Sequence, residues 1–239
     1  MPARRGILDL AQTILFVIVL VLVPLCLYVV FAVVPTESRM GVVQRIFYFH
    51  VPSAICAFLG VGVCAGASAL YLWKRDRRFD LLAHAGAELA VVFCSIVLIS
   101  GPIWARPVWG VWWTGEARLT STLVLWLIFV GYLVLRGSAD NPDQAARWGA
   151  VVAIVGALDV PIIYKSVAWW RGLHPRVLKA TGGQGLDPTM ERALMLCMLT
   201  FVLLFTYLII QRCRLGRLQD DVQALVHAAR RGSLPAART

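Results

Sequence analysis

The stretch LAQTILFVIVLVLVPLCLYVVFAVV, residues 10–34, contains no charged side chain. As a helix, its 25 residues exceed the roughly 20 that cross the hydrocarbon core of a bilayer. The rest of the chain has the same character: 59% of all residues are hydrophobic, 15% are charged and the mean hydropathy is +0.74. This composition leaves too little polar surface for a soluble domain, so we predict an all-α integral membrane protein.

Five further apolar runs are long enough to cross a membrane with their flanks. They cover residues 46–73, 81–104, 119–135, 148–164 and 193–211. The only interruptions by histidine or an acid are His50, His84, Glu88 and Asp159. Alternation with a period of two is absent, which excludes a β-barrel. We therefore expect six transmembrane helices within residues 1–215.

Basic residues predict the orientation of these helices. With six spans both termini share one side, and that side carries fourteen of the 23 Lys and Arg residues, including the short connection KRDRR at 74–78. Both termini are therefore expected in the cytoplasm. The net charge is +10, and the basic residues that produce it lie between and after the spans. We therefore expect a lipid bilayer as partner and no nucleic acid. Residues 216–239 are expected to form a cytoplasmic amphipathic tail.

Tryptophan is concentrated in one connection on the opposite, periplasmic side. The segment PIWARPVWGVWWTGEARLT, residues 102–120, holds four indoles within ten residues. An interfacial aromatic belt would spread its rings over many helix ends, so this density favours a platform for a flat apolar ligand. We expect a tryptophan-rich periplasmic loop at about 101–121. Its rim would be cationic and suited to a macrocycle with carboxylates, and the residues assigned to platform and rim are Trp104, Arg106, Trp109, Trp112, Trp113, Arg118, Trp169, Trp170, Arg171 and Arg176.

Two histidines fall on the same side. His50 begins the second span, with Pro52 expected in the first helical turn, and His174 follows the last tryptophan pair. Either alone could be a hydrogen-bonded packing residue. Together they could ligate one iron from its two faces, as haem axial ligands do. His84 and His227 are too far along the chain to join them and are assigned to packing.

Other features narrow the function classes. No glycine-rich phosphate loop is present, so nucleotide hydrolysis is not expected. No pair of cysteines has CxxC spacing, which argues against a thiol relay. We expect no enzymatic activity. Asp159 is expected to pair with Lys165 or an arginine, whereas Glu88 has no evident partner in the sequence.

Two segments carry a resemblance to a known family. GPIWARPVWGVWWTGEARLTS, residues 101–121, resembles the tryptophan-rich WWD signature of haem-handling membrane proteins. DVPIIYKSVAWWRGLHP, residues 159–175, resembles the later segment of one branch, the haem exporter protein C (CcmC) family. The resemblance covers about residues 42–211, with six spans in matching order.

The resemblance implies roles for individual residues. It makes His50, in YFHVP, and His174, in WWRGLHP, the axial ligands of the haem iron. The tryptophans that line haem correspond to Trp109, Trp112 and Trp113, and the signature arginine corresponds to Arg118.

The sequence departs from the family pattern at Gly115 and Glu116, where Trp-Asp is usual. Glu116 keeps the charge, but Gly115 removes an indole. The missing indole would affect either haem packing or docking of the haem acceptor. Restoring tryptophan at position 115 is expected to slow haem loss in the first case, unless Gly115 gives the loop a backbone turn that tryptophan cannot adopt.

The resemblance also implies a function without catalysis. It indicates a cytochrome c assembly factor that holds haem b as transient cargo at the periplasmic face of the bacterial inner membrane. Haem would pass to the periplasmic haem chaperone CcmE, beside an ABC transporter of CcmA and CcmB and the small membrane subunit CcmD.

Two alternatives belong to other classes. A bis-histidine membrane cytochrome b would carry electrons, although its ligands usually lie within the spans rather than at one face. A transporter permease is the second alternative, but the tryptophan-rich loop has no evident use in one.

Overall fold

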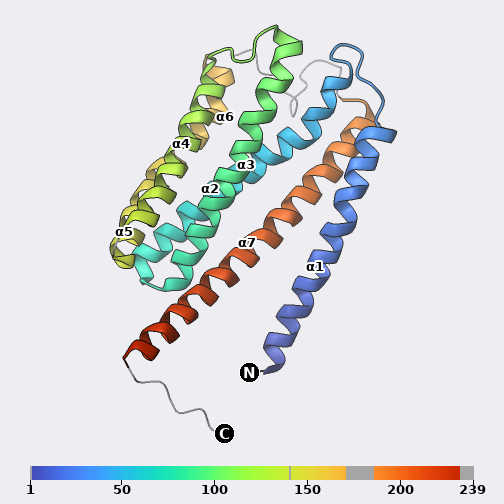
Figure 1. Ribbon diagram of the computed structural model, residues 1–239. Coiled ribbons are helices and arrows are strands. Elements are labelled where there is room, and N and C mark those ends of the chain that lie inside the picture. Colours follow the sequence, from blue (N-terminus) through green and yellow to red (C-terminus); the bar gives the residue numbers. More distant parts are fainter. Residues whose placement is uncertain (1, 140, 171–185, 232–239) are drawn as a thin grey trace.

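The computed structural model describes residues 2–139, 141–170 and 186–231. They form a bundle of long helices (Figure 1). In chain order the elements are α1 (Pro2–Tyr28) with the π-helical turn η1 (Val29–Val33), the 3₁₀ turn η2 (Val42–Ile46), α2 (Phe47–Lys74), α3 (Arg77–Trp109), α4 (Ala117–Ser138), α5 (Pro142–Ala157), α6 (Asp159–Trp169) and α7 (Pro188–Arg230).

Six helical segments are long and apolar enough to cross a membrane, as predicted. They are Asp9–Val33, Val42–Lys74, Arg77–Trp109, Ala117–Ser138, Pro142–Trp169 and Pro188–Arg230. No named strand occurs among the residues that the structure describes, which confirms the all-α fold class. The start of α1 and the end of α7 lie toward the same end of the bundle, as an even number of spans requires (Figure 1).

The fifth span is two helices, because α5 ends at Ala157 and α6 begins at Asp159. Pro161 explains the break: it has no amide hydrogen to donate to the carbonyl of Ala157. Asp159 does not form the expected ion pair with Lys165, and the alternative, a pair with an arginine, stays a prediction because Arg171 and Arg176 lie outside the described residues. The Oδ2 atom of Asp159 is buried with no hydrogen-bond partner in the described chain, and the Lys165 ammonium lies over the ring of Tyr164.

Small residues bring α2 and α3 into close contact. A Cβ atom on Gly60 would lie 2.8 Å from the backbone nitrogen of Ala90, and one on Gly86 would lie 2.9 Å from that of Cys64. Each helix therefore presents two small residues four positions apart, the pattern that allows close approach of helices in membranes. This pair forms the centre of the bundle, with α4 and α5 packed on one side.

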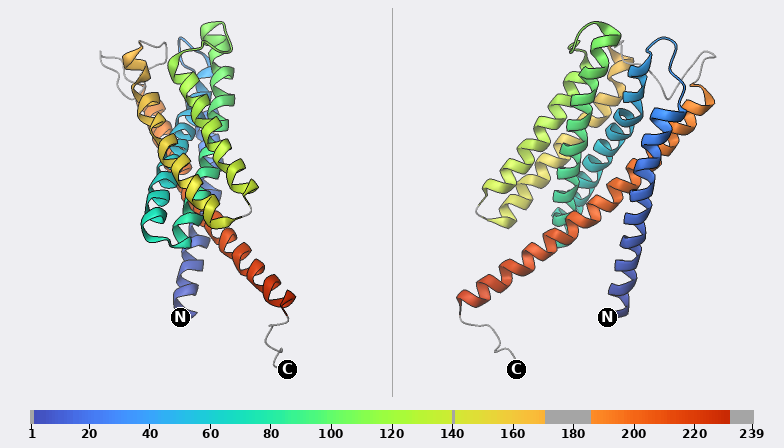
Figure 2. Two further views of the ribbon diagram at one scale, coloured as in Figure 1. Left: turned by 90° about the vertical axis from the view of Figure 1, so that its left-hand side faces the viewer. Right: turned by 45° about the vertical axis from the view of Figure 1, so that its right-hand side comes forward.

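Helix α7 packs against the other side of α2 and α3, and α1 packs against α7. Cys26 of α1 and Val30 of η1 meet Leu194 and Cys197 of α7 beside the buried ring of Tyr48. Figure 2 shows that α7 continues well past the bundle as one straight helix. The boundary expected near residue 216 therefore falls inside α7, and the placement of the tail on a cytoplasmic membrane surface stays a prediction.

Ion pairs join the helices at the end of the bundle opposite the tryptophan-rich connection. Glu88, which has no evident partner in the sequence, accepts two hydrogen bonds from the Arg212 guanidinium of α7. The carboxylate of Asp80 is 2% exposed and pairs with both Arg77 and Arg136. Helices far apart in the chain are thus tied by charge pairs with little water around them.

Candidate functional site

Four helix ends meet at one end of the bundle: the start of α2, the end of α3, the start of α4 and the end of α6 (Figure 1). The tryptophan-rich connection is shorter than expected. Because α3 continues to Trp109 and α4 begins at Ala117, only residues 110–116 lie outside helices, not the whole of 101–121. Most of the signature is therefore held on two helix ends rather than in a loop.

His50 lies in the first turn of α2 and contacts the end of α3. Its Nδ1 atom is 2.8 Å from Oγ of Ser100. The Ser100 hydroxyl donates its single proton to the carbonyl of Ile96 at 2.6 Å, so Oγ accepts from His50. The hydrogen-bond pattern thus assigns the proton of a neutral imidazole to Nδ1 and the lone pair to Nε2.

The start of α2 differs in one detail from the expectation. The 3₁₀ turn ends at Ile46 and α2 begins at Phe47, so Pro52 is the sixth helical residue and not part of the first turn. Its side chain is buried. The proline follows His50 by two positions and leaves the carbonyl of Tyr48 without a donor in the helix.

The His50 ring is enclosed by α3 and faces a cation. A Cβ atom on Gly101 would lie 3.5 Å from Cε1 of His50, so the helix passes close to the ring. The Arg118 guanidinium of α4 lies within electrostatic range of the imidazole. Arg118 also donates to the carbonyl of Tyr164 at 3.3 Å, which joins the start of α4 to α6. The structure thus brings His50 and Arg118 together, as the site requires.

The tryptophans of the connection form two groups. Trp104 and Trp109 pack edge to face on α3, with ring centroids 5.0 Å apart at 85°. Trp112 and Trp113 follow the helix and are 58% and 39% exposed. Two indoles are therefore fixed by each other, and two are presented to the surroundings.

The second tryptophan pair lies at the end of α6. The rings of Trp169 and Trp170 meet edge to face at 5.8 Å, and both are exposed. Because α6 ends beside the start of α4, this pair lies at the same end of the bundle as the connection (Figure 1).

Arg106 bonds the end of its own helix, and its place at the rim of the haem site stays a prediction. Its guanidinium donates to the carbonyl of Gly110, where α3 ends, and Gly110 adopts φ +78°. Arg106 therefore caps a helix by satisfying a terminal carbonyl. Glu116 is the N-cap residue immediately before α4, and its half-buried carboxylate lies near the positive end of that helix.

Gly115 is constrained by its backbone rather than by space. Its φ is +70°, which side chains other than glycine and asparagine rarely adopt, although nothing lies within 4 Å of the position of a Cβ. Gly115 therefore forms the backbone turn that the sequence left open, and a tryptophan there would strain this turn as well as add an aromatic ring.

The remaining predicted residues lie elsewhere. His174, Arg171 and Arg176 fall outside the described residues. The ring of His84 is 4.0 Å from Glu88, about 24 Å along α3 from Ser100, and His227 is on the far extension of α7. Both therefore stay apart from His50, as expected.

Sequence reasoning did not find Ser100. The sequence gives little indication that Ser100 belongs to the site, because a serine inside an apolar run usually forms a hydrogen bond within its own helix. Only the contact between α2 and α3 places it beside His50.

Comparison with known proteins places the chain among haem-handling membrane proteins. Residues 5–228 match the model of the family described as CcmC, heme exporter protein C. Among the relatives, heme exporter protein C of Bradyrhizobium diazoefficiens is 36% identical over 195 residues, which is 81% of this chain and 74% of that protein. The protein of the same name from Escherichia coli K12 is 34% identical, over 77% of this chain and 74% of the relative. That of Paracoccus denitrificans is 34% identical, over 75% of this chain and 76% of the relative.

Proposed function

Because the chain belongs to the haem exporter protein C family, we propose that it holds haem at the periplasmic face of the bacterial inner membrane and delivers it to the haem chaperone CcmE. It is a multi-pass membrane protein that handles haem in cytochrome c maturation. Haem is its cargo, and we propose that this cargo is haem b.

The observation that carries the proposal is the hydrogen bond between His50 and Ser100. Histidines that bind metals usually donate their other ring N–H to a fixed acceptor, which orients the ring and raises its basicity. Here Nδ1 donates to Oγ of Ser100, so Nε2 is the ligating nitrogen. This bond lies at the same end of the bundle as the tryptophans, which favours a ligand role for His50 over packing alone.

The surrounding residues suit the rest of the cargo. Trp112 and Trp113 present exposed indole rings that could cover an apolar macrocycle. Arg118, close to His50, has the planar guanidinium that binds carboxylates in a bidentate manner, as the propionates of haem would require. We propose His174 as the second axial ligand.

Delivery needs no covalent chemistry by the chain. Two neutral imidazoles would hold the iron from opposite faces and protect it until an acceptor offers a replacement ligand. Loss of one imidazole would then leave the iron with a single histidine ligand and weaken the binding of haem. We therefore propose a binding protein rather than an enzyme.

The partners and the orientation are proposals of the same kind. We propose that CcmA and CcmB, as an ABC transporter, and the small subunit CcmD work beside this chain. Both termini and the KRDRR connection would face the cytoplasm, as their basic residues favour.

Replacement of single histidines tests the function. His50→Ala and His174→Ala should each lower the haem that co-purifies and change the low-spin absorption spectrum. His84→Ala, on α3 at the other end of the bundle, is the matched control and should change neither. Wild-type spectra in both outer variants would overturn the ligand assignment.

A transfer assay separates assembly from electron carriage. Purified CcmE is added to the haem-loaded protein, and haem is followed to the chaperone by separation of the two proteins. Transfer supports delivery. Reduction and reoxidation with no transfer would favour an electron carrier instead.

A further inference from the structure

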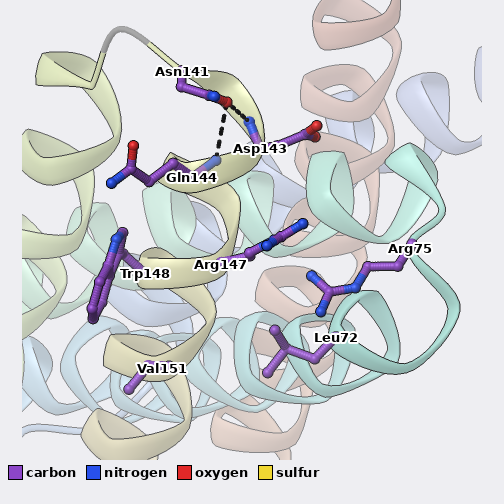
Figure 3. A pocket seen from close by; sticks show the side chains of 8 residues that line it. All are labelled: Leu72, Arg75, Asn141, Asp143, Gln144, Arg147, Trp148 and Val151. Carbon is purple, nitrogen blue, oxygen red and sulfur yellow. Dashed lines mark hydrogen bonds between the residues drawn. The ribbon is translucent and has the colours of Figure 1, made fainter.

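A hollow of about 570 Å³ lies between the end of α2 and the start of α5, at the end of the bundle away from the tryptophan-rich connection. Figure 3 shows the side chains that line it. These are Leu72, Arg75, Asn141, Asp143, Gln144, Arg147, Trp148 and Val151. The hollow takes no part in the haem site.

Two guanidinium groups point into this hollow from different helices. Figure 3 shows Arg75, just after α2, and Arg147, on α5, with their charged ends toward each other. Asp143 lies at the rim, yet within the described chain neither arginine has a carboxylate within 4.0 Å. Two like charges that share a hollow repel each other, so an anion between them would be stabilised.

The wall of the hollow continues into an apolar strip along α5. Trp148, Val151 and Val155 are 58%, 49% and 61% exposed and lie on one face of the helix, at spacings of three and four residues. An exposed indole beside arginines is typical of the depth at which lipid headgroups meet acyl chains. The strip would then lie along the chains of a lipid whose head reaches the arginines.

We propose that this hollow binds the phosphate of an anionic phospholipid headgroup, held by Arg75 and Arg147, with the acyl chains along the exposed face of α5. Guanidinium groups match phosphate oxygens in geometry as well as charge. A free phosphate ion offers the same head chemistry, but it would make no use of Trp148, Val151 and Val155. The lipid is therefore the occupant that accounts for both the two arginines and the apolar strip along α5.

The test is a lipid titration of the full chain in detergent, followed by native mass spectrometry. The probes are phosphatidylglycerol, phosphatidylcholine as a neutral lipid, and inorganic phosphate. Arg75→Gln and Arg147→Gln should each weaken the binding of phosphatidylglycerol about fivefold, and the double variant about twentyfold. Phosphatidylcholine binding should not change.

Arg78→Gln is the matched control, because Arg78 is an exposed arginine at the same end of the bundle that does not line the hollow. It should leave phosphatidylglycerol binding within twofold of wild type. Wild-type affinity in the double variant, or equal losses with Arg78→Gln, would overturn the proposal. Displacement of phosphatidylglycerol by millimolar inorganic phosphate would assign the hollow to a free anion and overturn the lipid. Arg75→Lys with Arg147→Lys should retain most of the binding, which separates the loss of charge from a failure to fold.

Discussion

His50 and Ser100 lie fifty residues apart in the sequence and are joined by a hydrogen bond of 2.8 Å between Nδ1 and Oγ. The Ser100 hydroxyl donates its own hydrogen bond to the carbonyl of Ile96, so it accepts from Nδ1 of His50. The bond between His50 and Ser100 therefore fixes both the orientation and the tautomer of the imidazole ring. A helix end that would otherwise carry a mobile imidazole thus presents one nitrogen, Nε2, in a set direction. Ser100 is a positioning residue in this scheme.

Ser100→Ala should weaken haem retention by about tenfold, because loss of the acceptor lets the ring rotate and lowers the basicity of the ligand. Stopped-flow transfer of haem to apomyoglobin measures the rate of loss, and resonance Raman spectroscopy reports the iron–histidine bond. Ser100→Thr keeps the hydroxyl and should restore both.

Ser95→Ala is the control for Ser100. Ser95 also donates to its own helix, but it accepts from the indole of Trp126 rather than from His50. Its replacement should leave the iron–histidine band unchanged. Equal effects of the two alanine variants would mean that α3 is merely destabilised.

Arg118→Gln should speed the loss of haem roughly tenfold or more, since a charge-assisted hydrogen bond is worth about 1.5–3 kcal/mol. Haem dimethyl ester, which lacks the carboxylates, should dissociate from the variant and from wild type at similar rates. Arg106→Gln, which removes a helix cap at Gly110, is the comparison. If Arg118→Gln loses haem and haem dimethyl ester equally faster than wild type does, binding of the propionates by Arg118 is excluded.

Gly115→Trp should fail to slow haem loss, although the family pattern has tryptophan there. The φ of +70° costs a residue with a side chain about 1–2 kcal/mol, as much as an aromatic contact contributes. Gly115→Asn tolerates this backbone conformation and should behave like wild type in the same transfer assay. A severalfold slower loss in Gly115→Trp would show that the turn adapts.

Gly60→Ala should lower the thermal stability of the detergent-solubilised protein. The new Cβ would collide with the backbone of Ala90, so α2 and α3 must separate, at a cost of about 1–3 kcal/mol. Gly62→Ala, two residues away with no atom within 4 Å, should be neutral or stabilising because alanine favours helix. Light-scattering or tryptophan-fluorescence melts measure both, and equal melting temperatures would contradict close packing of α2 on α3.

Val111→Cys should react with a membrane-impermeant maleimide added to spheroplasts, and Arg78→Cys should react only after lysis. Val111 is exposed in the tryptophan-rich connection, and Arg78 lies in the KRDRR connection. Native thiols should give little background, because five of the six cysteines are buried and Cys213 is half-buried. The reverse labelling pattern would invert the orientation.

Part of the candidate site could be read directly from the chain. His50, Arg118 and the tryptophans stand out because each is a costly or unusual residue at the edge of an apolar run, and their types point to iron, carboxylate and macrocycle. Arg106 shows the limit of this reasoning. Its neighbours in the sequence resemble a ligand rim, and only the structure shows that its guanidinium donates to the carbonyl of Gly110 at the end of α3.

The number of membrane helices follows from the sequence alone, since hydropathy and length act within each segment and need no neighbour, whereas the ends of α3 and α7 and the break between α5 and α6 came from the structure. Tertiary structure alone decided that His50 meets Ser100, that Glu88 meets Arg212 and that Gly60 approaches Ala90. The physical reason lies in the solvent. In lipid, the outward face of a helix is as apolar as its packed face, so hydrophobic periodicity does not reveal which face turns inward. Shape, small residues and polar pairs set the rotation of each helix, and these act only between helices.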